Sequence, residues 1–203
     1  MNYLAHLYLA DPDPEHRLGN LIGDWIKGPL EGRNLPPRVL AGIRRHRMVD
    51  SYSDTHPVMT RARSRFPGRH RRVAGIALDV LWDHFLVRHW PRQRYGPLET
   101  FLGDCYADLW SVRHLWPDHA APQVERIIRE DWISGYHDLR LVGNALARIG
   151  RRLSRDPGLY DIIDCVDANY TELERDFLRF PLLHARQPVT RVLLTGRIEQ
   201  GHP

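Results

Sequence analysis

A segment rich in apolar residues, ALDVLWDHFLVRHW, carries two carboxylates and an imidazole where a buried helix would be expected to place leucine. Asp79 and Asp83 stand one helical turn apart, and His84 follows directly. Ionised carboxylates at this spacing repel each other, and a buried carboxylate without a partner is strongly destabilising. A divalent cation would neutralise both at short range. We therefore predict that Asp79, Asp83 and His84 are metal ligands. The alternatives are that one acid pairs with an arginine or turns to the surface.

A second predicted helix, residues 37–52, repeats this pattern on one face. Val39 and Ile43 begin the face, and His46 and Asp50 continue it within the same sector. A His–Asp pair one turn apart is also a common structural hydrogen bond, so the pair alone does not establish a metal site. If this pair faces Asp79 and Asp83 across the core, the four side chains form a set of imidazole and carboxylate ligands. Such a set would suit Mn, Fe, Co or Zn, and oxygen-rich sets favour Mn or Mg.

A third segment, GNLIGDWIKG, contributes polar residues whose role the periodicity leaves open. Asn20, Asp24 and Lys27 share a face away from the apolar stripe, and this pattern favours a solvent-facing side. The glycines of this segment, each less favourable in a helix than alanine by about 1 kcal/mol, indicate close approach to a neighbour or a ligand. His6, in the apolar segment NYLAHLYLA, fits a core histidine better than a ligand.

These segments belong to a chain that we predict to be all-α. Period-2 alternation with hairpin turns is missing, and the proline-containing breaks are spaced as between helices. A length of 203 residues favours a single domain. The predicted helices cover residues 15–27, 37–52, 57–66, 69–90, 97–112, 122–150 and 157–180. A β-like TRVLL in the final stretch suggests an extended tail or a short strand.

Composition narrows the class of protein. With 42% hydrophobic and 27% charged residues, the chain has the composition of a globular protein. No apolar run approaches the roughly 20 residues that a bilayer crossing needs, so we expect no membrane association. The N-terminal segment lacks the basic region and cleavage site of a secretory signal, and we expect a cytoplasmic protein. Two cysteines are too few for a disulfide framework or a cysteine zinc site, so a bound metal would have oxygen and imidazole ligands.

The net charge of +4 is unevenly distributed. Nine arginines fall between residues 42 and 72, and this basic segment is either a solvated surface or a docking site for an acidic partner. Aromatic interleaving and recognised nucleic-acid motifs are missing, so we do not expect nucleic acid to bind. The arginines that we assign to partner binding are Arg44, Arg45, Arg47, Arg69, Arg71 and Arg72.

Taken together, NYLAHLYLA, GNLIGDWIKG, HRMVD and LDVLWDHFLVRHW resemble the acyl carrier protein phosphodiesterase family in order, over roughly residues 1–185. The resemblance implies an all-helical fold related to the HD-domain metal phosphohydrolases with rearranged elements. It implies Mn²⁺-dependent removal of 4′-phosphopantetheine from a serine of acyl carrier protein, an acidic partner that the arginines would attract. The DH order at Asp83–His84 reverses the His–Asp pair for which the HD group is named. Individual ligand roles therefore do not transfer from ordinary HD enzymes.

The resemblance also implies roles for individual residues. Asp24 carries over as a metal ligand or catalytic acid, beside His46, Asp79, Asp83 and His84 as metal ligands. Such a metal would lower the pKa of a bound water and neutralise phosphoryl charge. We expect His84, Lys27 or His6 to protonate the leaving serine oxygen. We expect three residues to hydrogen-bond to the metal ligands and orient them without binding the metal: Asp50, Asn20 and His6.

Two other functions fit the sequence. One is an HD-like phosphohydrolase that acts on a nucleotide or another small phosphoester. The other is a non-enzymatic helical module in which the inner acids merely pair with arginine and the surface binds an acidic protein or nucleic acid. We expect the helical domain to cover residues 1–187 and a separate C-terminal tail to cover 188–203.

Overall fold

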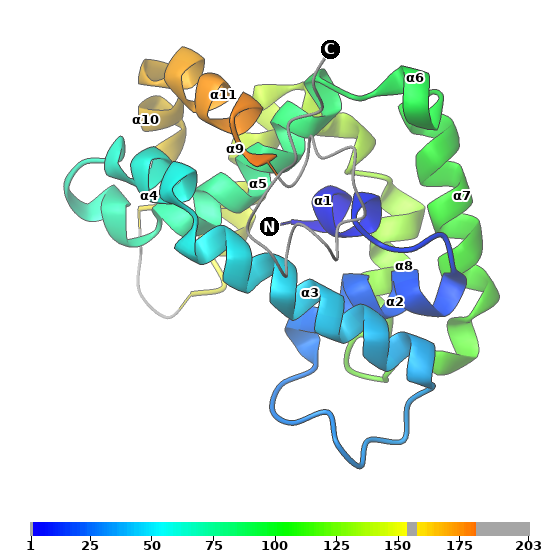
Figure 1. Ribbon diagram of the computed structural model, residues 1–203. Coiled ribbons are helices and arrows are strands. Elements are labelled where there is room, and N and C mark those ends of the chain that lie inside the picture. The colour runs from blue at the N-terminus through cyan, green and yellow to red at the C-terminus, as the bar shows by residue number, and fades with distance from the viewer. Residues whose placement is uncertain (1, 154–157, 182–203) are drawn as a thin grey trace, which may run out of the picture.

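The regular secondary structure of the described part of the protein, residues 2–153 and 158–181 of a computed structural model, is all helical (Figure 1). The N-terminal half contains α1 (Tyr3–Tyr8), α2 (Pro14–Ile22), α3 (Pro37–Thr55), α4 (Pro57–Ser64) and α5 (Ala74–Arg88). The C-terminal half contains α6 (Arg92–Tyr95), α7 (Leu98–Ser111), α8 (Ala121–Glu130), α9 (Leu139–Gly150), α10 (Ile162–Ala168) and α11 (Tyr170–Leu178). Short 3₁₀ turns, η1 (Gly23–Trp25), η2 (Gly68–Arg72), η3 (Arg113–Leu115) and η4 (Ser134–His137), join several of them. No strand occurs in these ranges, which confirms the all-α prediction.

The helix α5 is the centre of the core. It is apolar on nearly all sides and packs against α1, α4, α9, α11 and η4. Its largest buried side chains are Trp82 and Phe85, and α11 adds Phe177 against both rings. The short helix α1 lies between α5 and α3, as Figure 1 shows in the middle of the molecule. The element that carries the N-terminal histidine is therefore enclosed from two sides.

Several predicted helices are broken by local signals. The predicted helix 122–150 ends at Asp131, whose backbone is left-handed (φ 39°), and restarts where the Asp138 side chain accepts a hydrogen bond from the Arg140 N–H. The predicted helix 69–90 begins only at Ala74, because a 3₁₀ turn follows Pro67, and 157–180 is split near Asn169. The sequence analysis missed α1 and α6. The predicted TRVLL strand and tail lie outside the described residues.

None of the helices in the described ranges has both the length and the apolar character needed to cross a bilayer.

The closest packing in the fold brings α2 against α3. A Cβ at Gly19 would overlap the carbonyl oxygen of Val39, and one at Gly42 would overlap the carbonyl of His16. Both are backbone atoms, which cannot move aside without shifting a helix. The two glycines therefore set the separation of α2 and α3, and the glycine pattern of the sequence is explained here by contact with a neighbouring helix.

The substitution Gly19→Ala should lower the free energy of unfolding by about 1–3 kcal/mol, because the methyl group forces the two helices apart. Gly103→Ala is the matched control. Gly103 lies within α7 with open space around its Cα, so alanine there should raise the free energy of unfolding by about 0.5–1 kcal/mol. Urea denaturation of both variants measures the difference. Equal effects would contradict the packing role of Gly19.

Candidate metal centre

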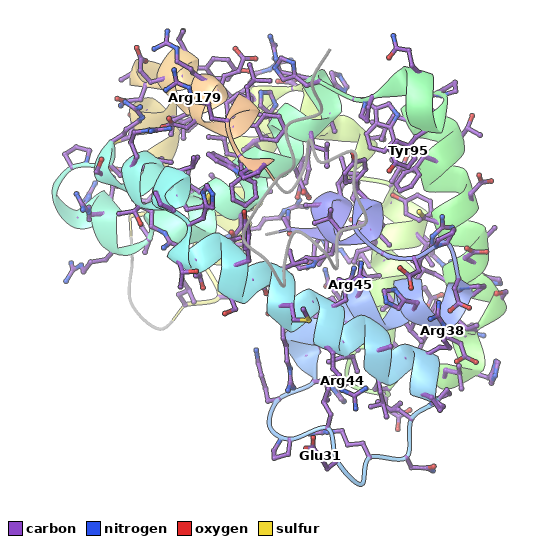
Figure 2. All side chains as sticks on the ribbon, viewed as in Figure 1. Glu31, Arg38, Arg44, Arg45, Tyr95 and Arg179 are labelled. Carbon is purple, nitrogen blue, oxygen red and sulfur yellow. The ribbon has the colours of Figure 1, made fainter. Side chains whose placement is uncertain are left out.

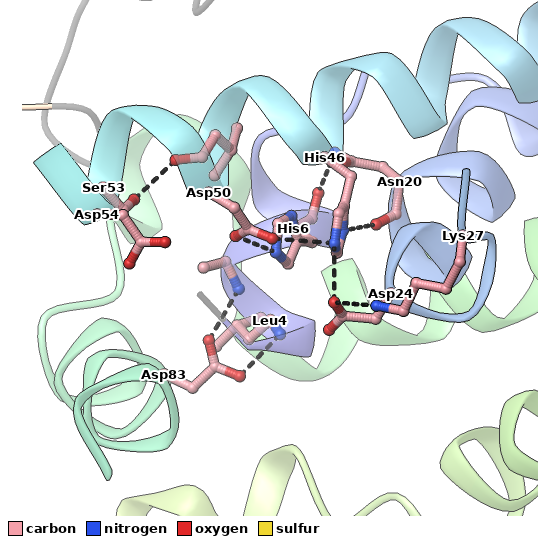
Figure 3. Close-up of polar contacts among 12 residues, drawn as sticks. Leu4, His6, Asn20, Asp24, Lys27, His46, Asp50, Ser53, Asp54 and Asp83 are labelled. Carbon is pink, nitrogen blue, oxygen red and sulfur yellow. Dashed lines mark hydrogen bonds and ion pairs between the residues drawn. The ribbon is translucent and has the colours of Figure 1, made fainter. Parts of the chain in front are cut away.

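Two histidines and a carboxylate from α1 and α3 meet in the interior (Figure 3). The Nε2 atom of His6 lies 3.3 Å from Oδ1 of Asp50, and Nε2 of His46 lies 3.1 Å from Oδ2. One ligand atom from each of the three residues lies within 4.8 Å of the other two. Both histidines are buried, and Asp50 is partly buried. This group has the residue types and the spacing that could hold a metal ion.

The ring of His46 is held in one orientation. Its Nδ1 lies 2.8 Å from the carbonyl oxygen of Asn20, and because a carbonyl can only accept, Nδ1 donates and Nε2 points to Asp50. Gly23 makes room for this ring, because a Cβ there would collide with the imidazole. The Asn20 side chain in turn donates to the carbonyl of His6 at 2.7 Å. The periodicity had placed Asn20 on a solvent-facing side, but the residue is fully buried because α3 covers that side.

The two imidazole rings stack, with centroids 3.9 Å apart and planes at 19°. Both Nε2 atoms and Nδ1 of His6 are buried without a hydrogen-bond partner among the described residues, although both Nε2 atoms lie close to Asp50. Buried polar atoms nearly always have a partner, and ring nitrogens that converge on a carboxylate without hydrogen-bonding to it are unusual. The donor set fits a divalent ion of the Mn or Zn type, which takes imidazole and carboxylate ligands.

Asp24 and Lys27 lie at the solvent side of this group. Oδ1 of Asp24, in η1, is 3.6 Å from Nε2 of His46, and Nζ of Lys27 is 3.9 Å from the same carboxylate oxygen. Their side chains are 66% and 81% exposed, as the periodicity predicted for both. The structure thus brings Asp24 to His46, a proximity that periodicity could not indicate.

The charges of the group are strongly coupled. Burial lowers the pKa of His6 to about 4. Burial also opposes the charged form of His46, but the carboxylates of Asp24 and Asp50 outweigh it and raise the pKa to about 9. Burial works against ionised Asp50, yet the two imidazoles outweigh it and hold its pKa below the usual range. His46 holds the pKa of Asp24 low as well. Both carboxylates therefore stay ionised next to the histidines.

The structure does not bring Asp83 into this group. Its two oxygens each accept a backbone N–H at 2.9 Å, one from Leu4 and one from Ala5 at the start of α1. Burial raises its pKa to about 7, and the two N–H groups oppose the rise. The sequence analysis expected a metal, an arginine or solvent to compensate this carboxylate. Two backbone donors at a helix start take that place, so Asp83 positions α1 and, with it, His6.

His84 is also held elsewhere. Its Nδ1 donates to the carbonyl of Tyr136 at 2.6 Å, and its Nε2 accepts from the hydroxyl of Tyr170 at 2.7 Å. Neither ring nitrogen is left for a metal in this arrangement. Asp79, partly buried on α5, is also not among the ligand atoms that meet at His6, His46 and Asp50.

The structure therefore redistributes the predicted site. Of the predicted ligands it places His46 in the group and Asp24 beside it. It adds His6 and Asp50, which the sequence analysis had placed as supporting residues. The His–Asp spacing on α3 was a usable signal for Asp50. No local signal could have identified His6, because its partners lie 40 and 44 positions away in the chain.

The predicted arginine docking segment is largely occupied with structural contacts. Arg45 donates to the carbonyl of Leu9 at 3.0 Å, and Arg47 donates to the carbonyls of Ile26 and Gly28 at 2.7 and 2.8 Å. Figure 2 shows Arg45 on α3, at the side that faces the start of the chain. These two side chains bind loops of their own chain.

Of the four remaining arginines predicted to bind a partner, one forms an ion pair among the described residues and three do not. Arg69 pairs with Asp161. Arg44, Arg71 and Arg72 are exposed, and in the described ranges they show no ion pair or hydrogen bond. A role in docking stays a prediction for these three.

Comparison with known proteins agrees with the resemblance seen in the sequence. A family model described as acyl carrier protein phosphodiesterase matches residues 1–182. The chain belongs to the acyl carrier protein phosphodiesterase family. Proteins of that name from Serratia proteamaculans and Shigella boydii serotype 18 are 39% and 38% identical to it over 183 and 184 residues, and one from Salmonella paratyphi A is 36% identical over 181. Each match covers 89% of this chain and 93% of the relative. No solved structure matches the chain.

The substitution Asp83→Ala should lower the free energy of unfolding by about 2–4 kcal/mol, because two buried N–H groups lose their acceptor. Asp104→Ala, at an exposed position of α7, is the control and should change it by less than about 0.5 kcal/mol. Urea denaturation monitored by circular dichroism compares the two. If Asp83→Ala were as stable as the control, the anchoring of α1 by Asp83 would be wrong.

Proposed function

We propose that the protein is a metal-dependent phosphodiesterase that hydrolyses holo acyl carrier protein to apo acyl carrier protein and 4′-phosphopantetheine. The observation that carries this proposal is the convergence of two buried Nε2 atoms on the carboxylate of Asp50, at 3.3 and 3.1 Å. We infer the substrate from the family to which the chain belongs. We infer metal-assisted hydrolysis from the histidine and carboxylate side chains of the group. Imidazole and carboxylate ligands beside solvent suit metal-assisted hydrolysis.

His6, His46 and Asp50 would hold the ion, and Asp24 lies beside them at the solvent side. We expect Mn²⁺, with Mg²⁺ or another divalent ion as an alternative. When bound, the ion supplies a Lewis acid that activates water and neutralises phosphoryl charge. A ligating imidazole must be neutral, so metal binding would displace the proton that the carboxylates of Asp24 and Asp50 favour on His46. The hydrogen bond from Nδ1 of His46 to Asn20 directs Nε2 toward the ion.

The residues at the rim suit the proton transfers. Asp24 is exposed and ionised, so its carboxylate would accept the proton of the attacking water. Lys27, beside Asp24, would donate a proton to the leaving serine oxygen or stabilise its charge. We do not assign this step to His84, because both of its ring nitrogens are engaged by tyrosines.

We also propose a relation to the HD-domain enzymes, a domain that covers residues 1–187 and a cytoplasmic location. The HD-domain relation is supported by histidine and carboxylate donors on helices, here one turn apart on α3 as His46 and Asp50. A domain that covers residues 1–187 is supported by a family match that ends at 182. A cytoplasmic location rests on the sequence alone.

Hydrolysis of holo acyl carrier protein with Mn²⁺, followed by mass spectrometry of the carrier protein, tests the function. Wild-type protein should release phosphopantetheine only with the metal. His46→Asn and Asp50→Asn should lower kcat at least about 100-fold, more than the loss of an outer partner costs. Both should weaken Mn²⁺ binding in calorimetry.

His84→Asn is the matched control, because it removes a buried imidazole that lies outside the group. The Kd of this variant for Mn²⁺ should stay within about threefold of the wild-type value, because no side chain that binds the metal directly is lost. Hydrolysis of free nucleotides but not of the carrier protein would favour the small-substrate alternative. Tight Mn²⁺ binding by His46→Asn would refute the proposed ligand set.

A further inference from the structure

A pocket outside the metal group lies between α1, α8 and α9. The rings of Tyr3 and Trp132, with centroids 6.2 Å apart, line the pocket, and Arg126, Arg148 and Arg152 add three guanidinium groups. None of these arginines falls in the basic segment of residues 42–72. Arg148 and Arg152 stand one turn apart at the end of α9 and just after it, and α8 adds Arg126 from 22 positions before Arg148.

The pocket carries positive charge that the described part of the chain does not neutralise. Arg126 is paired with Glu130 at 3.0 Å. Arg148 and Arg152 have no ion pair to an acidic side chain within residues 2–153 and 158–181. The guanidinium carbons of Arg126 and Arg148 lie 5.0 and 5.6 Å from the ring centroid of Trp132. Stacking on the indole limits the motion of these arginines and so favours the binding of an anion.

The pocket adjoins the candidate metal centre through α1. Tyr3 lines the pocket, and His6 follows it on the same helix at a spacing that places two side chains on one face. The Tyr3 ring also stacks on Trp25 with centroids 6.1 Å apart, next to Asp24. A substrate whose phosphodiester lies at His6 and Asp24 would therefore have its adjoining part within reach of the arginines.

We propose that this arginine pocket binds a carboxylate side chain of the protein substrate, close to the serine that carries the phosphodiester. The inference rests on the proposed function and adds a specificity-determining site to it. The scissile phosphate itself would lie at the metal centre, so a second anionic group is needed to match Arg148 and Arg152. A planar carboxylate accepts two parallel hydrogen bonds from a guanidinium group, which gives direction as well as charge.

The test is the double charge reversal R148E/R152E, compared with R113E/R179E. Arg113 and Arg179 are exposed and lie away from the pocket, and the control changes the net charge by the same amount. Any loss caused by weaker long-range attraction is therefore equal in the two proteins. If R148E/R152E does not fold, the neutral variant R148Q/R152Q is measured in its place. Mn²⁺ calorimetry and circular dichroism check that each variant keeps its metal site and its helices.

We expect R148E/R152E to raise KM for holo acyl carrier protein at least about tenfold, with kcat within about threefold, because docking and not the reacting group is changed. The control should change KM less than about twofold. Bis(p-nitrophenyl) phosphate is a small diester without a carboxylate. Each variant should hydrolyse it at the same rate as the wild-type protein. An unchanged KM, or an equal rise in the control, would overturn the proposal.

Binding of apo acyl carrier protein separates this proposal from the proposed function. Fluorescence anisotropy of the labelled carrier measures docking without hydrolysis. If wild-type protein binds the carrier but does not hydrolyse it, the proposed function fails, and a tenfold weaker affinity of R148E/R152E still supports the pocket. Wild-type affinity in that variant would reject the pocket even if hydrolysis is observed.

Discussion

The burial of two imidazole rings against one carboxylate is the constraint on which the rest of the structure depends. His6 and His46 stack in the interior with their Nε2 atoms next to Asp50 and without hydrogen-bond partners in the described residues. Polar atoms in such a place are costly unless something pairs with them. A cation at the meeting point of these atoms would satisfy all three groups together. The buried arrangement that needs a cation is therefore also the donor set of the proposed chemistry.

Two features of the fold make this arrangement rigid. Gly19 of α2 and Gly42 of α3 let the two helices approach closely enough for Asn20 and Gly23 to fix the ring of His46. On the other side, Asp83 of α5 binds the first backbone N–H groups of α1 and so fixes the helix that carries His6. Each donor is thus supported by a neighbouring helix. Chemical sites need such supporting contacts to keep their geometry.

The sequence predicted the helical class and much of the α3 contribution because both depend on local periodicity. His46 and Asp50 follow the apolar face of their helix, and the structure places them together. Periodicity failed where a contact joins distant segments. It placed Asn20 in solvent and His6 in the core without a role, and it could not show that backbone N–H groups would compensate Asp83. The break at Asp131 was also missed, since a left-handed residue other than glycine leaves little trace in the sequence.

The most direct test of the central claim is a crystal structure of the protein grown with Mn²⁺, with anomalous diffraction used to locate the ion. We expect one strong anomalous peak in contact with Nε2 of His6, Nε2 of His46 and a carboxylate oxygen of Asp50. A peak beside Asp79 and Asp83, or no peak at the two imidazoles, would contradict it.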